Sequence, residues 1–293
     1  MEKSVYVVLV QWGKADLTID CIKSLFESTY TNLHIVIVDN ASPDDSLNII
    51  RKYEGEKVKV ITAKTKNGFS AGNNLGIKYA IRCKADYILL LNNDTVVDKN
   101  LVNDLVENCN DHCITVPKIY YYSKPDIIWY AGGNINYKTG RAYHIGQDEP
   151  DSPEYSKKRE VDFATGCCLL IPHSIITNVG LMDESYFLYW EDVDYSLRFR
   201  NKGYKIIFCP DAKVWHKVNS STGTQSKVSL YYGNRNRLYV TKKYNFGFIP
   251  FSIALSTRLI LFAKGCIKNS NEKIIGKAIS DFYKGVRGKV PYV

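Results

Sequence analysis

The first 120 residues alternate between short apolar runs rich in β-branched side chains and stretches in which apolar residues have helical spacing. An apolar run of about 4–8 residues without polar alternation predicts a strand that is buried on both faces. Repeated strand–helix–strand units of this kind predict a parallel sheet joined by right-handed crossovers. The predicted strands cover residues 4–10, 34–39, 58–63, 86–92 and 114–120.

The segments between and after these strands favour helices on the faces of the sheet. Residues 123–160 are different, because they are polar and contain many Pro, Gly and Tyr residues, which favours hairpins and loops within the same domain. We therefore predict an α/β fold with a Rossmann-like, mostly parallel sheet flanked by helices. The predicted helices cover residues 17–26, 44–53, 71–81 and 191–203, and a later strand covers 204–210.

Polar residues follow the predicted strands at the points where ligands bind to sheets of this type. In parallel α/β sheets the ligand lies beyond the carboxyl ends of the strands. Three of the four strand ends are rich in Asp, Asn or Gly, which predicts a polar site at this edge. The four segments are residues 11–13, 39–42, 66–72 and 92–94.

Asp39 ends the second predicted strand. A carboxylate at this position can accept hydrogen bonds from a ribose hydroxyl or a base N–H. The same residue can instead stabilise the turn or cap the helix that follows, together with Asn40, Ser42 and Asp44. For Asp39 we leave both interpretations open.

The loop over residues 67–76 joins the third strand to a helix and contains three glycines. Glycine allows backbone N–H groups to approach a ligand closely, and a helix N-terminus favours anions. The loop matches neither the dinucleotide-binding nor the P-loop pattern. It indicates a binding site only weakly when taken alone.

Asn92, Asn93 and Asp94 end the most apolar strand. Hard cations such as Mg²⁺ and Mn²⁺ prefer oxygen ligands and keep positions open for substrate phosphates. A turn followed by a helix cap is the structural alternative. The buried strand that precedes Asp94 favours the metal site.

Glu191, Asp192 and Asp194 open a predicted helix directly after the aromatic residues at 186–190. Acidic residues stabilise the first turn of a helix, which explains one or two of the three carboxylates. Aromatic side chains beside carboxylates are typical of carbohydrate sites, because sugar rings have apolar faces and hydroxyls that need a base. His216 lies downstream and is a candidate second metal ligand, although a single His is more often structural.

Seven segments occur in an order that resembles the inverting family 2 glycosyltransferases of the GT-A fold, in particular the rhamnosyltransferase-like and galactofuranosyltransferase-like members. The resemblance covers roughly residues 4–240, which we expect to form the catalytic domain (1–240), followed by a helical extension (241–293). The segments are VYVVLVQWG, VDNASPDDS, NGFSAGNNLGI, LLLNNDT, ATGCCLLIP, VGLMDESYFLYWEDVDYSLR and VWHKV.

The resemblance implies a role for each matching position. Asp192 resembles the catalytic base, and Asp94 resembles the last position of the D-x-D metal motif. The first Asp of that motif is replaced by Asn92 in this chain, so its first carboxylate is missing. His216 resembles the residue that completes the Mn²⁺ or Mg²⁺ site. The residues expected at the donor and its nucleotide are Gln11, Asp39, Asn67, Gly68, Gly72, Asn73, Asn92 and Asn93, and those expected at the acceptor are Gly166, Cys167, Trp190 and Glu191.

The activity implied by the resemblance is transfer of a sugar with inversion from a nucleotide-diphosphate donor to a hydroxyl of a glycan or lipid-linked acceptor in cell-surface polysaccharide synthesis. The resemblance favours dTDP-rhamnose as the donor, with a UDP-hexose as the second candidate. A nucleotidyltransferase is one alternative, but it needs a Gly-rich basic loop after the first strand, which residues 11–16 do not provide. The other alternative is an inactive module that binds glycans or nucleotides.

Charge distinguishes the extension from the rest of the chain. The formal net charge is +9, and residues 241–293 carry ten Lys and Arg against two Asp and Glu, a net of +8 that leaves +1 for residues 1–240. We therefore expect no nucleic-acid partner. Residues 246–264 are strongly apolar, which leaves open whether the extension binds an anionic membrane, packs on the catalytic domain or forms a homodimer.

The N-terminus lacks the features of a secretory signal, and the eight cysteines are scattered through apolar stretches. Reduced thiols packed as small apolar side chains are the expected state, and the C-x-x-x-C spacing of Cys109 and Cys113 gives no typical zinc site. We expect a cytoplasmic protein, and membrane binding by the extension, one of the alternatives left open above, would make it peripheral on the inner face of the cell membrane.

Overall fold

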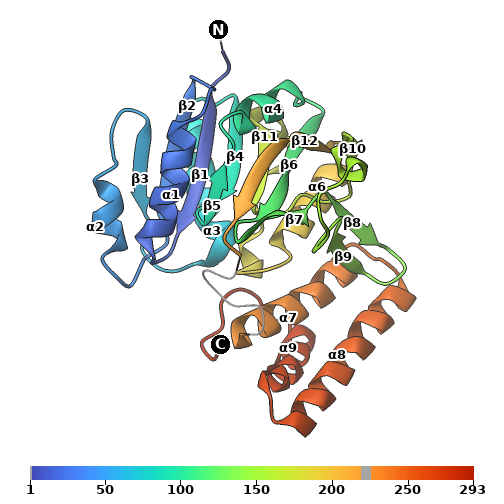
Figure 1. Cartoon of the computed structure of the whole chain (residues 1–293). Helices are drawn as coiled ribbons and strands as arrows, with labels where there is room; N and C mark the ends of the chain where they lie inside the picture. The colour runs from blue at the N-terminus through green and yellow to red at the C-terminus, as the bar shows by residue number, and fades with distance from the viewer. Residues whose placement is uncertain (1, 219–225) are drawn as a thin grey trace.

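The structure is a computed structural model that describes residues 2–218 and 226–293. Within these ranges a ten-stranded sheet forms the centre of the molecule, and a bundle of helices lies beyond one edge of it (Figure 1). A separate two-stranded ribbon, β8 (Gly133–Asn136) with β9 (Arg141–His144), projects near the bundle. The sheet carries most of the buried apolar side chains.

The N-terminal half of the sheet confirms the predicted parallel arrangement, with the strand order β3-β2-β1-β4. The chain moves outward from β1 to β3 and then returns past β1 to β4. Because crossovers are right-handed, this reversal places α1 and α3 on opposite faces and opens a crevice at the strand ends. The elements are β1 (Val5–Gln11), α1 (Ala15–Phe26), β2 (Leu33–Asp39), α2 (Ser46–Arg51), β3 (Val58–Thr62), α3 (Gly68–Arg82) and β4 (Tyr87–Asn92).

The second half contains one reversed strand. β11 (Cys168–Pro172) runs antiparallel to β4 and to β6 (Cys113–Tyr121), so β6 points in the same direction as β1 to β4. β12 (Lys205–His216) is parallel to β6, with a register shift between Cys209 and Lys213. The predicted strand at 204–210 therefore continues as far as His216, which the sequence analysis placed in the separate segment VWHKV. As a result, six strands have their carboxyl ends at the same edge of the sheet, namely β1, β2, β3, β4, β6 and β12.

The polar region at 123–160 forms hairpins, as predicted. It supplies β7 (Lys124–Tyr130), which pairs with β6, and the β8–β9 ribbon. The remaining elements before the bundle are β5 (Thr95–Val97), α4 (Leu101–Glu107), η1 (Pro153–Ser156), β10 (Arg159–Glu160), α5 (His173–Val179), η2 (Glu184–Tyr186) and α6 (Glu191–Asn201).

The C-terminal bundle consists of α7 (Lys227–Lys243), α8 (Phe248–Lys268), η3 (Asn271–Lys273) and α9 (Ile274–Tyr283). The domain boundary expected at residue 240 falls inside α7, which packs on both α8 and α9. The Asn236 side-chain amide donates hydrogen bonds of 2.8–3.0 Å to three carbonyls in the loop before α6, and Lys243 pairs with buried Asp194 at 2.6 Å. Part of the extension therefore packs on the catalytic domain.

Candidate active site

A cavity of about 630 Å³ opens where the strands of the sheet end. The end of β1, the β4–β5 turn, the start of β11, the start of α6 and the end of β12 all contribute to its wall. The predicted site residues that line it are Gln11, Gly68, Asn92, Asn93, Asp94, Gly166, Cys167, Glu191, Asp192 and His216. Residues separated by more than 200 positions in the chain thus meet in one cavity, as the strand-end argument predicts.

Asp39 does not line this cavity. Its side chain is 1% exposed, and its carboxylate accepts hydrogen bonds from the hydroxyl and the backbone N–H of Ser42. The Ser42 hydroxyl oxygen in turn accepts a hydrogen bond from the backbone N–H of Gly13 at 2.9 Å. In this structure Asp39 stabilises the two turns that follow β1 and β2, and its contact with a nucleoside stays a prediction.

Four further predicted residues also lie outside the cavity wall. A Cβ on Gly72 would lie 2.6 Å from Val10 Cγ1, so this glycine lets α3 pack closely on β1. The Asn73 amide donates to the Phe69 carbonyl one turn earlier in α3. Asn67 stands at the start of α3, where its backbone N–H donates to Asn40 Oδ1. Trp190 precedes α6 in a left-handed backbone conformation with φ of 73°.

Asp192 lies in the first turn of α6 with its carboxylate held by two backbone donors. The Gly166 N–H donates to Oδ2 at 3.1 Å, and the Val193 N–H donates to Oδ1 at 2.8 Å. Burial raises the pKa of Asp192, whereas these hydrogen bonds favour its ionised form. The carboxylate is thus fixed in orientation and kept at the wall of the cavity, as a general base requires.

Glu191 is the second carboxyl group at this position. Its Oε2 atom has no hydrogen-bond partner among the described residues, and burial, with the Asp192 charge beside it, raises the pKa of Glu191 to about 8. Two adjacent buried carboxylates do not both ionise readily. Ionisation of one carboxyl group therefore opposes ionisation of the other, and the raised pKa of Glu191 favours its neutral form.

Asp94 and His216 meet although 122 positions separate them. β5 pairs antiparallel with the end of β12, which sets Thr95 opposite His216 and brings His216 Nε2 to 3.1 Å from Asp94 Oδ1. His216 Nδ1 is buried and has no hydrogen-bond partner in the described ranges. The predicted metal-ligand pair is therefore assembled in the fold.

The donor set fits a divalent cation that also takes ligands from substrate. Residues 2–218 and 226–293 contain no cluster of three or more His, Cys, Asp or Glu side chains that could hold a metal. One carboxylate and one imidazole leave several coordination positions open, which suits Mg²⁺ or Mn²⁺ because these ions accept phosphate and water oxygens as ligands. Two protein ligands are adequate only when a phosphate completes the site.

An aromatic wall that the sequence analysis did not assign comes from the hairpin region. Trp129 lies edge-on to both His216 and His144, with ring centroids 4.7 and 4.6 Å apart. Burial lowers the pKa of His144 to about 4, so this imidazole stays neutral. Trp129 and His144 both line the cavity. The aromatic residues between 120 and 144 were visible in the sequence, but their pairing with β6 was not.

The mouth of the cavity carries an exposed aromatic side chain and a cation. Trp12 is 41% exposed, and Lys66 Nζ lies 2.9 Å from the centroid of the Trp12 ring. Burial, and to a smaller extent Lys289, lowers the pKa of Lys66 to about 8. Both residues fall in the strand-end segments 11–13 and 66–72, where the sequence predicts a polar site, but the sequence analysis assigned neither an individual role.

Gln11 is fully buried at the end of β1, and neither atom of its side-chain amide has a hydrogen-bond partner among the described residues. Such a group is costly to bury without a partner. Because Gln11 lines the cavity, a polar ligand in the cavity can supply the missing hydrogen bonds. This observation supports its predicted role in binding.

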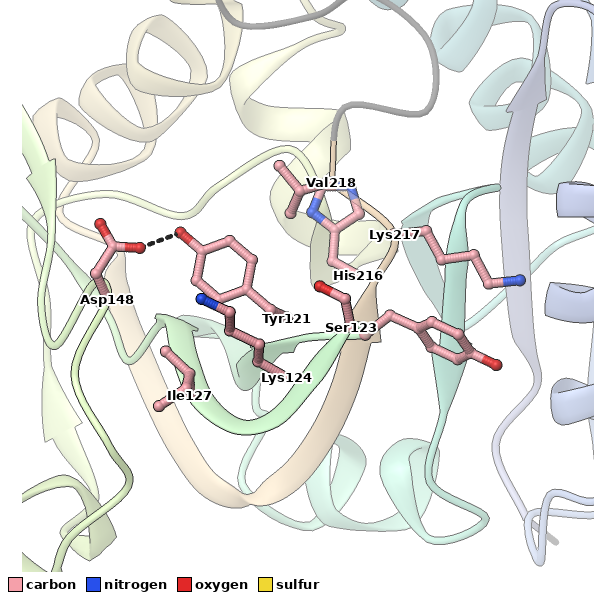
Figure 2. Close-up of a pocket in the computed structure, with 9 residues that line it drawn as sticks. Tyr121, Ser123, Lys124, Ile127, Asp148, His216, Lys217 and Val218 are labelled. Carbon is pink, nitrogen blue, oxygen red and sulfur yellow. Dashed lines mark hydrogen bonds between the residues drawn. The ribbon is translucent and has the colours of Figure 1, made fainter.

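A second cavity of about 550 Å³ adjoins the first and shares His216 and Val218 with it. Figure 2 shows the side chains of Tyr121, Lys124 and His216 around this space. The Tyr121 hydroxyl donates to Asp148 Oδ1 at 2.6 Å, which fixes the aromatic ring at the cavity wall. The second cavity thus combines an aromatic side chain with charged groups next to the Asp94–His216 pair.

Comparisons with known proteins identify the family of the chain. The sequence model of glycosyl transferase family 2 matches residues 6–180. A dTDP-rhamnosyl transferase of Shigella flexneri is 23% identical over 98% of both chains. A low-salt glycan biosynthesis hexosyltransferase of Haloferax volcanii is 26% identical over 74% of this chain and 69% of its own. A galactofuranosyltransferase of Mycolicibacterium smegmatis is 27% identical over 55% of this chain and 25% of its own.

Solved structures identify the fold. The GalNAc-T7 structure with UDP, GalNAc and Mn²⁺ matches with a TM-score of 0.65 and 17% identity over 97% of this chain and 58% of its own. A mannosyltransferase of Pyrobaculum calidifontis with GDP-Man and Mn²⁺ matches with a TM-score of 0.60 and 12% identity over 99% and 77%. The predicted GT-A fold is confirmed. The chain belongs to glycosyl transferase family 2.

Proposed function

We propose that this protein transfers a sugar, with inversion, from a nucleotide-diphosphate donor to a hydroxyl group of an acceptor. The observation that carries this proposal is that Asp192 and the Asp94–His216 pair line one cavity. Inverting transfer needs a base on one side of the anomeric carbon and charge neutralisation on the leaving-group side. The cavity offers a candidate for each.

The donor occupies the part of the cavity next to β1 and β4. The base stacks on exposed Trp12, the Gln11 amide takes a polar group of the donor, and Lys66 lies near the phosphates. Asp94 and His216 would hold Mn²⁺ or Mg²⁺. When bound, the cation would supply Lewis-acid stabilisation of negative charge on the diphosphate leaving group.

Asp192 removes the proton from the acceptor hydroxyl as that oxygen attacks the anomeric carbon of the donor sugar and the nucleoside diphosphate leaves. The N–H groups of Gly166 and Val193 orient its carboxylate, so little reorganisation is needed at the moment of reaction. Protonated Glu191 avoids a second negative charge beside the base. General-base assistance of this kind contributes ~10²–10⁴-fold to the rate.

The proposed donor is dTDP-rhamnose, with a UDP-hexose second. The Shigella relative, which is named a dTDP-rhamnosyl transferase, covers almost the whole of this chain, and this supports the first choice. The acceptor is a glycan or a lipid-linked sugar in cell-surface polysaccharide synthesis. The second cavity, with Tyr121 and Lys124, gives room for the part of the acceptor beyond the reacting hydroxyl.

The proposal is tested by incubating the protein with single nucleotide sugars in Mn²⁺ and measuring release of the nucleoside diphosphate. We expect release from dTDP-rhamnose or from a UDP-hexose, and suppression by a chelator. Absence of release from every nucleotide sugar, with the nucleotides still bound, would instead indicate an inactive binding module. Incorporation of a nucleotide from a nucleoside triphosphate and a sugar phosphate would favour the nucleotidyltransferase alternative.

A further inference from the structure

The outer face of α8 is apolar and uncovered. Ile249, Ile260 and Ile267 are 68%, 66% and 86% exposed. Their spacings of 11 and 7 residues place them within about 20° of one another around the helix. Ala254, Arg258 and Gly265, which are buried against the bundle, lie on the opposite side. The three isoleucines therefore lie on one face of the helix, which we call the α8 stripe.

The size of the stripe is unusual for a surface that meets only water. α8 extends over 21 residues and is, among the described residues, long and apolar enough to cross a membrane by length and composition. Only 22% of its most apolar window is buried. Figure 1 shows α8 as the outermost helix of the bundle, on the side away from the sheet. A large exposed apolar surface of this kind marks an interaction site.

Charge indicates what covers the stripe. α8 contains three cationic residues and no acidic residue, and its exposed Lys264 and Lys268 flank the C-terminal end of the stripe. Exposed Lys273 follows in η3. Glu272 of η3 lies near Lys264 and Lys268 and offsets one of these charges, so this end of the stripe stays net positive. Two copies of this positive region would repel each other, whereas anionic lipid headgroups would pair with it. An amphipathic helix with cations beside an apolar face is typical of an interfacial helix.

The contacts of Arg258 favour a helix that lies on the bilayer surface and does not cross it. Arg258 is buried in the middle of α8, where its Nε donates to the Asn234 carbonyl of α7 at 3.1 Å. Crossing the membrane would separate α8 from α7 and place this guanidinium in hydrocarbon, which is costly. A helix lying in the interface keeps Arg258 against α7 and buries only the stripe.

We propose that the α8 stripe inserts into the headgroup boundary of an anionic lipid bilayer and holds the catalytic domain at the membrane surface. The bundle also forms part of the reaction cavity, because Ser229 of α7 lines it and α7 packs on α8. Insertion therefore fixes the distance between the cavity and the bilayer. The link to a lipid-linked acceptor rests on the proposed function, whereas membrane binding itself does not.

The test is co-sedimentation of the full chain with vesicles of phosphatidylcholine containing phosphatidylglycerol, compared with vesicles of phosphatidylcholine alone. The test variant is Ile260→Asp/Ile267→Asp, which changes two exposed positions. The matched control is Phe26→Asp, because Phe26 is 53% exposed on α1, outside the bundle. Each isoleucine withdrawn from the bilayer changes partitioning about tenfold or more.

We expect the wild-type chain and Phe26→Asp to pellet with anionic vesicles, and the double variant to remain soluble. Thermal unfolding and release of nucleoside diphosphate from a soluble donor should be unchanged in the double variant, so that loss of binding is separated from failure of the proposed function. Equal pelleting of the double variant would overturn the proposal. A wild-type dimer that the double variant converts to a monomer, without vesicle binding, would show that a second copy covers the stripe.

Discussion

Asp39 and Asp192 are two aspartates at the same edge of the sheet, and the fold uses them differently. The Asp39 carboxylate is hydrogen-bonded to Ser42 and lines neither of the two cavities formed by the described residues, whereas Asp192 is held by two backbone N–H groups and lines the larger one. Burial raises the pKa of Asp192. A position at the end of a strand is therefore not enough to make a carboxylate a candidate catalytic base. The carboxylate also needs access to substrate and donors that leave it free to accept a proton.

The largest expected effect comes from Asp192→Asn. The amide cannot accept the proton of the acceptor hydroxyl, so transfer should fall by about 10²–10⁴-fold. Donor affinity measured by calorimetry should stay near that of the wild-type protein, because Asp192 acts on the acceptor side. Asp39→Asn is the matched variant, and its kcat should stay within a few-fold of wild type, with changes confined to stability and the KM for the donor. A larger fall in kcat for Asp39→Asn than for Asp192→Asn would reverse the comparison.

The second largest effect is expected from His216→Ala. Removing one of the two proposed protein ligands should weaken Mn²⁺-dependent nucleotide binding by at least about tenfold. His144→Gln is the control, because His144 packs on the same Trp129 ring but lies outside the ligand pair. Calorimetry with and without Mn²⁺ measures the effect. Equal nucleotide affinity in both conditions for the wild-type protein would remove Asp94 and His216 from metal binding.

A smaller effect is expected from Gly166→Ala. The added Cβ would lie 3.0 Å from Phe69 Cε1, so either the Phe69 ring or the Gly166 backbone must shift by a few tenths of an ångström, whereas its 3.6 Å distance to Asp192 Cβ is ordinary contact. A shift of the Gly166 backbone would displace the N–H that holds the Asp192 carboxylate. Such a displacement should lower kcat by roughly tenfold. Gly233→Ala, where no heavy atom lies within 4 Å of the new Cβ, should leave kcat unchanged. Equal kcat values for the two variants would show that the orientation of Asp192 tolerates the shift.

The smallest effect is on stability and its pH dependence. The pKa of Glu191 rises from 4.5 to about 8 on folding, so the folded state binds the extra proton between these values and loses stability as pH rises through them. Glu191→Gln removes this loss. Its Tm relative to wild type should therefore be several degrees higher at pH 9 than at pH 5. A Tm difference that does not change with pH would show that Glu191 ionises normally in the folded state.

The sequence predicted the strands well because buried parallel strands are continuous apolar runs with clear ends. It did not predict which polar residues at those ends face the ligand. Gly72 illustrates the reason, since glycine permits close approach equally to an anion and to Val10 of a neighbouring strand. Asp94 and His216 were candidate metal ligands from their chemistry and from the family resemblance, but their contact could not be predicted, because it depends on the pairing of β5 with β12.

The aromatic wall was missed for a related reason. Trp129 lies in β7, whose position depends on irregular pairing with β6, including two register shifts. A shift of one residue moves a side chain to the other face of a strand. No local pattern in residues 123–160 could therefore decide whether Trp129 or its neighbours point toward His216. The α8 stripe, in contrast, follows directly from helical spacing.

The configuration of the newly formed glycosidic bond tests the central claim most directly. A single displacement with Asp192 as base inverts the anomeric centre, because the acceptor attacks from the face opposite the nucleotide. Proton NMR of the product formed in the first minutes of the reaction, with the donor of known configuration, reads the outcome. We predict the inverted anomer in the wild-type protein and almost no product with Asp192→Asn. A product with retained configuration would contradict the assignment of Asp192 as the base of a single displacement.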